Sequence, residues 1–144
     1  MSLSIARSAL VMFSQQQMFD LVNDVVSYPQ FLPWCSRSSV LELGDRYMVA
    51  DIEVSKGGVR QRFVTRNEFP AGERISMELV EGPFAFLRGA WEFKALREDA
   101  CKISLMLDFE LQQGLAKVAF GTVFNHAANS MVDAFCTRAR QVYG

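Results

Sequence analysis

Residues 114–143 contain no proline and repeat their apolar positions with the 3.6-residue period of an α-helix. Apolar side chains such as Phe120, Phe124 and Phe135 fall on one half of a helical projection, and polar side chains fall on the other half. A helix of this extent is roughly 40 Å long, which is enough to cross a small domain. Because its apolar half needs an apolar partner of similar length, we expect the rest of the chain to supply that surface.

The composition indicates one domain in a reducing compartment. A chain of 144 residues buries roughly 68–70% of its unfolded surface as a single domain. The net charge of −1 gives no overall attraction to nucleic acid or anionic lipid. The three cysteines have no paired spacing, which argues against disulfides and zinc ribbons. We see no signal peptide and no membrane-spanning apolar run, so one cytoplasmic domain over residues 1–144 is predicted.

The N-terminal part of the chain carries a strand signal followed by helix signals. Residues 3–11 alternate as a strand does, and they are followed by Ser14 and Gln17 in the spacing of a capping box. The helical repeat after this box ends near residues 24–27. Two prolines then restrict the aromatic-rich residues 28–34 to a turn or a one-turn helix. One or two short helices are therefore predicted after the first strand.

Turn signals at 44–45, 57–58, 70–72, 82–83 and 98–99 divide the middle of the chain into six segments of strand length. The last four of them place apolar side chains on one parity and charged ones on the other, as in an antiparallel sheet with one wet face. We predict an α+β helix-grip fold, in which a curved seven-stranded antiparallel sheet wraps around the C-terminal helix. The first strand is expected to pair with the last, and a cavity is expected between sheet and helix.

Several short stretches resemble the START-like/polyketide cyclase superfamily. They are residues 26–35 (VSYPQFLPWC), 82–84 (GPF), 89–93 (GAWEF), 120–121 (FG) and 139–143 (ARQVY). Within that superfamily the chain is similar, over essentially its full length, to the branch that holds the coenzyme Q-binding proteins of respiration. The order and length of the predicted elements agree with the helix-grip fold that this resemblance implies.

The branch has two described roles, and the resemblance implies both as alternatives. The first is non-enzymatic binding of ubiquinone or a related isoprenoid lipid in the cavity, in support of respiratory electron transport. No cofactor is required for this role, and a transient peripheral contact with the inner membrane accompanies it. The second is that of a toxin that binds the large ribosomal subunit and blocks subunit joining, with a small ubiquitin-like antitoxin as its partner. A cyclase-like enzyme is a further alternative, because the superfamily contains cyclases.

Ligand-binding candidates are the residues that the pattern and the resemblance place at the cavity or its mouth. They are Phe31, Leu32, Trp34, Phe84, Phe86, Trp91, Phe93, Lys117, Phe120 and Phe124. The same aromatic side chains also suit a closed core, and those of residues 28–34 suit a clasp at one end of the sheet. Lys117 falls within the apolar arc, where it either reaches a ligand head group or extends into water.

Charged candidates lie outside the predicted core. Arg60, Arg62 and Arg66 share the outer face of one strand and Arg74 lies on the outer face of the next, which suits ribosomal phosphates or a solvated sheet face. The single histidine, His126, falls on the polar side of the helix, so neither a catalytic triad nor an HExxH metal site is predicted. Because almost no ionisable residue has inward parity, we predict a binding protein with no catalytic residue and no metal.

Overall fold

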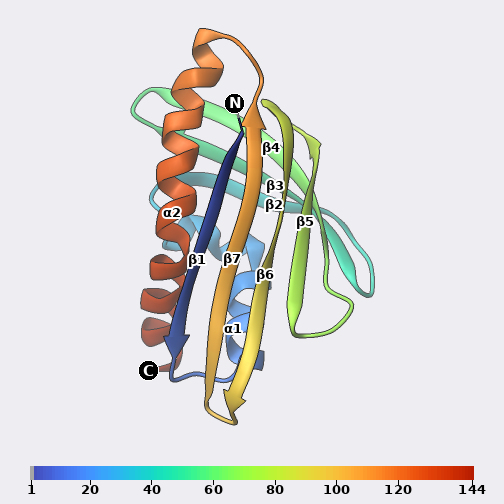
Figure 1. Cartoon of the computed structure of the whole chain (residues 1–144), viewed down its shortest axis with the longest axis vertical. Coiled ribbons are helices and arrows are strands. Elements are labelled where there is room, and N and C mark those ends of the chain that lie inside the picture. The colour runs from blue at the N-terminus through green and yellow to red at the C-terminus, as the bar shows by residue number, and fades with distance from the viewer. Residues whose placement is uncertain (1) are drawn as a thin grey trace.

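The computed structural model describes residues 2–114 and 118–144, together with the backbone of residues 115–117. Its order is one strand, two short helices, six strands and a long helix, as predicted (Figure 1). The elements are β1 (Leu3–Val11), α1 (Gln15–Asn23), the 3₁₀ helix η1 (Val25–Gln30), β2 (Cys35–Leu43), β3 (Tyr47–Lys56), β4 (Val59–Glu68), β5 (Arg74–Glu81), β6 (Phe84–Arg97), β7 (Ala100–Leu111) and α2 (Leu115–Tyr143).

The strands form one antiparallel sheet of seven strands in the order β1-β7-β6-β5-β4-β3-β2. The predicted pairing of the first strand with the last is confirmed, with Ile5 opposite Leu107 in the register of β1 and β7. Figure 1 shows that β7 leads directly into α2, which returns along the sheet beside β1. The α+β helix-grip arrangement is therefore present, and α2 covers the inner face of the sheet.

Local sequence chemistry explains the two short helices. At the start of α1, Ser14 Oγ accepts a hydrogen bond from the Gln17 backbone nitrogen at 3.0 Å, and Gln17 Oε1 accepts one from the Ser14 nitrogen at 2.9 Å. This is the capping box that the sequence predicts. Pro29 lies inside η1, and no backbone hydrogen is available there to extend a regular α-helix. The segment is accordingly a short 3₁₀ helix.

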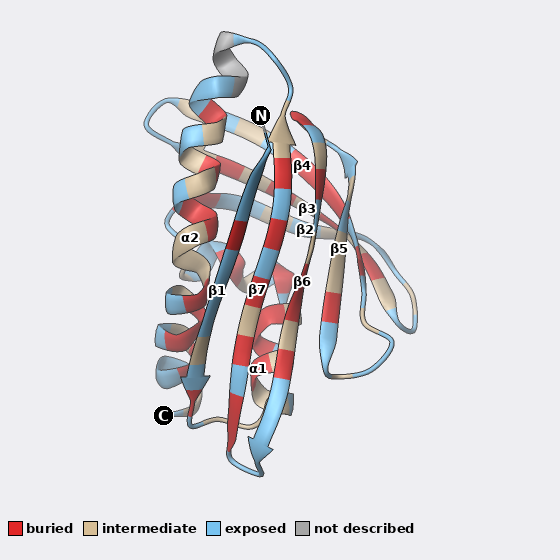
Figure 2. Cartoon of the chain, viewed as in Figure 1, coloured by how far each residue is buried: buried red, intermediate tan, exposed pale blue. Residues whose placement is uncertain are grey.

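The core consists of the inward-facing side chains of the sheet and one face of α2. Along β7, Ile103, Leu105, Leu107 and Phe109 are buried while the residues between them are more exposed, an alternation visible in Figure 2. This confirms the parity predicted for that strand. Among the residues that the structure describes, no helix combines the length and apolarity needed to cross a membrane.

Aromatic side chains form two clusters along α2. Near its N-terminal end, the rings of Phe84 and Phe109 pack within 4.9 Å of the ring of Phe124, measured between centroids. Further along, the rings of Tyr28 and Trp91 lie 5.5 and 5.3 Å from that of Phe135. Edge-to-face pairs of this kind hold rigid side chains in fixed places. The clusters set the spacing between sheet and helix on either side of the helix midpoint.

The pairing of β5 with β6 ends at Glu78 and Arg88. The register of β4 with β5 shifts between Val64 and Thr65, where β5 carries one extra residue, and a bulge interrupts β6 between Phe84 and Phe86. The turn between β5 and β6 requires glycine, because Gly82 has a φ of +151° and an added Cβ would lie 2.7 Å from Phe63 Cβ. Irregularities of this kind bend the strands that carry them.

Candidate functional site

A cavity of about 60 Å³ lies between the inner face of the sheet and α2. It occupies the space between the two aromatic clusters, because its helical wall begins at Phe124 and ends at Met131. The other lining residues come from η1, the following connection and the sheet. They are Val25, Tyr28, Trp34, Ile52, Phe63, Thr65, Asn67, Met77, Leu87, Trp91, Leu105 and Leu107, with Ala127 and Ala128 completing the helical wall.

The cavity exists because two adjacent helix positions carry small side chains. Ala127 and Ala128 are both buried on α2, with Phe124 one turn before them and Phe135 two turns after them. The clusters around Phe124 and Phe135 hold helix and sheet apart, and two methyl groups do not fill the space left between them. Two half-buried methionines, Met77 on β5 and Met131 on α2, complete the wall. Their unbranched side chains are the most adaptable part of it.

One polar pair interrupts the apolar lining. Thr65 and Asn67 on β4 are 4% and 7% exposed, and Thr65 Oγ1 donates a hydrogen bond to Asn67 Oδ1 at 2.8 Å. Sequence reasoning did not single them out, although a signal existed. Both share the parity of the inward-facing Phe63 and oppose the outward arginines of the same strand.

Tyr28 is the only tyrosine among the described residues that line the cavity. It donates a hydrogen bond to the Val22 carbonyl at 2.5 Å, and burial raises its pKa well above the ordinary value. At neutral pH the Tyr28 hydroxyl is thus protonated, and its hydrogen is used in the bond to the Val22 carbonyl. Because the described lining contains no Asp, Glu, Lys, Arg or His, the cavity presents no acid–base pair of the kind that general catalysis needs.

The structure brings three of the predicted ligand-binding residues together at the cavity: Trp34, Trp91 and Phe124. Four others, each at most 2% exposed, are packed in the core outside the cavity wall: Leu32, Phe84, Phe93 and Phe120. The cavity wall on α2 therefore lies further along the helix than Phe120.

The last three ligand-binding candidates lie away from the cavity or outside the description. Phe31 and Phe86 are half-buried, and each ring centroid has an arginine guanidinium carbon at 5.0 Å, from Arg138 and Arg88 respectively. The Lys117 side chain lies outside the described residues. A role for these residues in ligand binding stays a prediction.

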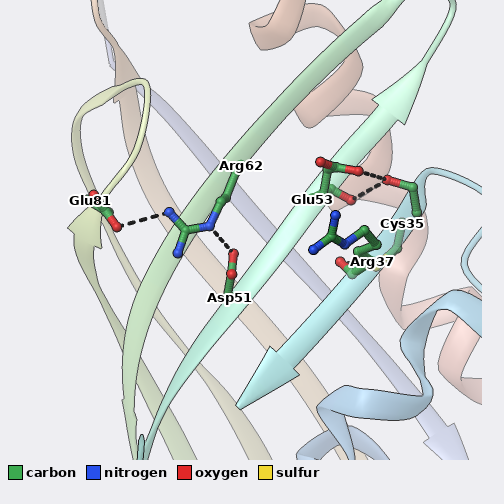
Figure 3. Close-up of polar contacts among 7 residues, drawn as sticks. Cys35, Arg37, Asp51, Glu53, Arg62 and Glu81 are labelled. Atoms are coloured by element: carbon green, nitrogen blue, oxygen red, sulfur yellow. Dashed lines mark hydrogen bonds and ion pairs between the residues drawn. The ribbon is translucent and has the colours of Figure 1, made fainter. Parts of the chain in front are cut away.

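The four predicted phosphate-binding arginines lie on the outer face of the sheet, and each has a carboxylate partner. Figure 3 shows Arg62 between Asp51 and Glu81, with nitrogen–oxygen distances of 2.7 and 3.1 Å. The other three pairs are Arg60–Glu53 at 3.9 Å, Arg66–Glu68 at 3.2 Å and Arg74–Glu92 at 3.0 Å. Neighbouring carboxylates balance the positive charge of this face, so it offers less unneutralised charge to phosphate than the arginines alone indicate.

The three cysteines are free and buried. Burial raises the pKa of each thiol, that of Cys35 to about 11. Such thiols hold little of the reactive thiolate at neutral pH. Within the described part of the chain, no three His, Cys, Asp or Glu side chains are grouped to hold a metal ion.

The sequence is similar to a protein family and to individual relatives of known name. The family model described as "Polyketide cyclase / dehydrase and lipid transport" matches residues 11–136. The chain is 54% identical over 144 residues, 100% of both chains, to "Ribosome association toxin RatA" of Pseudomonas aeruginosa. It is 30% identical to the mitochondrial "Coenzyme Q-binding protein COQ10 homolog B" of Xenopus laevis, over 96% of this chain and 59% of that one.

Solved structures share the fold at low identity. The crystal structure of the "Zhui aromatase/cyclase" of Streptomyces sp. R1128 superposes with a TM-score of 0.85 at 16% sequence identity, covering 98% of this chain and 95% of that one. At this identity the similarity concerns the START-like fold and not the reaction.

Proposed function

The chain belongs to the polyketide cyclase/dehydrase and lipid transport family, and on that premise we propose that it is a non-enzymatic binding protein that associates with ribosomes. The large ribosomal subunit is the proposed target, and the joining of the two subunits is the step that the protein blocks. The observation that carries this proposal is the 54% identity to a ribosome association toxin over the whole length of both chains. The 30% identity to a coenzyme Q-binding relative is much lower.

The geometry of the cavity supports binding without turnover. Its described lining presents threonine, asparagine and tyrosine but no carboxylate, amine, guanidinium or imidazole. A cyclase of the same fold needs an acid or a base aimed at its substrate. The cyclase-like alternative therefore lacks the groups that would carry its chemistry.

A subunit-joining assay tests the ribosome proposal directly. Purified large and small subunits are mixed with magnesium, with and without a stoichiometric excess of the protein, and separated on a sucrose gradient. We expect fewer joined particles, more free subunits, and the protein in the large-subunit fractions. An unchanged profile with the protein left at the top of the gradient would reject the proposal. Addition of the protein to preformed joined particles is the control that separates blocked joining from active splitting.

A second candidate function is the binding of an apolar molecule in the cavity, and ubiquinone or another isoprenoid lipid is the proposed ligand. The apolar cavity lined by Trp34 and Trp91 favours it. The cavity volume of about 60 Å³ equals roughly two water molecules' share of liquid volume. A substituted ring therefore enters only if Met77 and Met131 move aside, and an isoprenoid tail extends beyond the cavity.

Native mass spectrometry of detergent-free protein tests this second function. We expect a mass excess that organic extraction removes and that liquid chromatography identifies as a quinone. Protein that carries no extractable lipid and binds none in titration would reject it. Two further partners are proposed: a small ubiquitin-like antitoxin for the ribosome-binding function, and a transient membrane contact for the lipid-binding function. Co-purification from the native host tests the former and vesicle flotation tests the latter.

A further inference from the structure

The side-chain amide of Asn67 is hydrogen-bonded through its oxygen but not, within the described residues, through its nitrogen. Its Oδ1 accepts the hydrogen bond from Thr65, and its Nδ2 makes no hydrogen bond to another described residue. No fully buried side-chain nitrogen or oxygen of the described residues lacks a partner, so this Nδ2 is in contact with open space. Since Asn67 is 93% buried and lines the cavity, that space is the cavity interior.

In the structure the Thr65 hydroxyl bonds the Oδ1 end of the Asn67 amide, so the Nδ2 end is directed away from Thr65. A hydroxyl that donates to Oδ1 fixes the amide plane, and the two N–H groups of Nδ2 then point elsewhere. The cavity consequently contains a donor that is not matched by an acceptor. A ligand oxygen at this place would accept the hydrogen bond that no described residue accepts from Nδ2.

The lining also excludes one class of lipid. No described lining residue is a Lys, Arg or His that would neutralise a carboxylate. The Tyr28 hydroxyl is committed to the Val22 carbonyl. An ionised fatty acid head would therefore be buried without a counter-charge, which costs far more than a neutral polar group does.

We propose that the Thr65–Asn67 pair determines the specificity of the cavity, by selecting a neutral apolar molecule whose carbonyl or ether oxygen accepts a hydrogen bond from Asn67 Nδ2. Quinones and aryl ketones are the ligand class, and fatty acids are rejected. The ring of the ligand lies against Trp91 and Phe124, and the displaced Met77 and Met131 close around it. This inference rests on the second candidate function above and names the group that recognises the ligand.

Intrinsic fluorescence reports on occupancy, because both tryptophans of the chain, Trp34 and Trp91, line the cavity. Decylubiquinone is titrated into the wild-type protein, and tryptophan quenching is followed. Decylbenzene and decanoate then compete for the site. We expect decylbenzene, which lacks the oxygen, to bind about three- to tenfold more weakly than decylubiquinone, the value of one net hydrogen bond. Decanoate at pH 7.5 should compete more weakly still.

Substitution of Asn67 tests the recognition directly. Asn67→Leu should weaken decylubiquinone binding about three- to tenfold and leave decylbenzene binding unchanged. Thr65→Val keeps Asn67 but removes the hydrogen bond that orients its amide. It should reduce the preference for decylubiquinone over decylbenzene by a smaller factor than Asn67→Leu does. It is the variant to use if Asn67→Leu does not fold. Asn129→Leu is the matched control, because Asn129 is half-buried on α2 but does not line the cavity. Circular dichroism confirms that each variant is folded.

The outcomes separate this proposal from the function on which it rests. If neither decylubiquinone nor decylbenzene binds, the ligand-binding function itself fails. If both bind equally well, and folded Asn67→Leu or Thr65→Val changes neither, the cavity binds apolar molecules but the polar pair does not select them. Tight competition by decanoate would overturn the exclusion of charged lipids.

Discussion

Filling the cavity with two carbon atoms should stabilise the protein. Ala127 is 2% exposed and lines the 60 Å³ space, so Ala127→Val places its added methyl groups there. At about 24 cal/mol per Å³, a cavity of this volume costs about 1.4 kcal/mol. Burial of two carbons at about 0.8 kcal/mol each gives a similar value. Valine in a helix costs up to about 0.7 kcal/mol relative to alanine, so we expect a net gain of about 0.8 kcal/mol.

Urea unfolding measures this gain. The midpoint should rise at constant m value, and the melting temperature should rise by about 3 °C for a domain of this size. Ala139→Val is the matched control, since Ala139 is fully buried on α2 but does not border the cavity. Overpacking there should cost about 1–3 kcal/mol. If Ala127→Val loses as much stability as Ala139→Val, the space between α2 and the sheet is not free volume and the reasoning is wrong.

The same variant separates the two candidate functions. Ala127→Val should weaken decylubiquinone binding, because the added methyl groups fill part of the cavity that the ligand enters. The variant should block the joining of ribosomal subunits as well as the wild-type protein does. A stable Ala127→Val protein that no longer prevents joining would mean that the ribosome-bound state requires the cavity.

The other predictions concern the core, the thiols and the outer face. Phe135→Ala should cost about 3–5 kcal/mol, because Phe135 is fully buried, whereas Phe124→Ala should reduce ligand binding more than Phe135→Ala does; urea unfolding and quinone titration check both. Burial raises the pKa of Cys35 to about 11, so the folded protein keeps a proton that the unfolded chain loses above its ordinary pKa of 9.0. The free energy of unfolding should therefore fall between about pH 9 and 11, and less steeply in Cys35→Ala; equal slopes would show that another group is responsible. Arg62→Gln should leave the urea midpoint almost unchanged, because the ion pairs of an exposed arginine contribute little to stability. It should change subunit joining by less than about twofold, because Asp51 and Glu81 already balance its charge; a large loss on the sucrose gradient would instead place ribosomal RNA at this face.

Periodicity and local chemistry were enough to predict the elements and their faces. The capping box at Ser14 is a contact between neighbours in the chain, so its residues predict it without any tertiary information. The alternation of β7 and the apolar half of α2 likewise state which side chains turn inward. A sheet with one apolar face and a helix with one apolar half have few ways to pack, which is why the helix-grip fold was predictable.

The position of a residue on one face of a strand or helix states that its side chain points inward, but it does not state which residues that side chain contacts. Phe120 and Phe124 are one turn apart on the same helical face, yet only Phe124 borders the cavity, because Phe84 packs against both and closes the space beside Phe120. Thr65 and Asn67 had inward parity, but parity does not state that they line the same cavity as Trp91 on β6 and Phe124 on α2.

The outer face shows the same division. The sequence indicates that Arg62 points to solvent, whereas its carboxylate partners come from β3 and the end of β5, strands that only sheet register brings beside it. The chain alone thus determined the helix-grip fold and the wet face of the sheet, both of which follow from residue type and short-range spacing. Tertiary packing decided where the cavity lies, which side chains line it and which carboxylates lie beside Arg62, because each depends on residues that are distant in sequence.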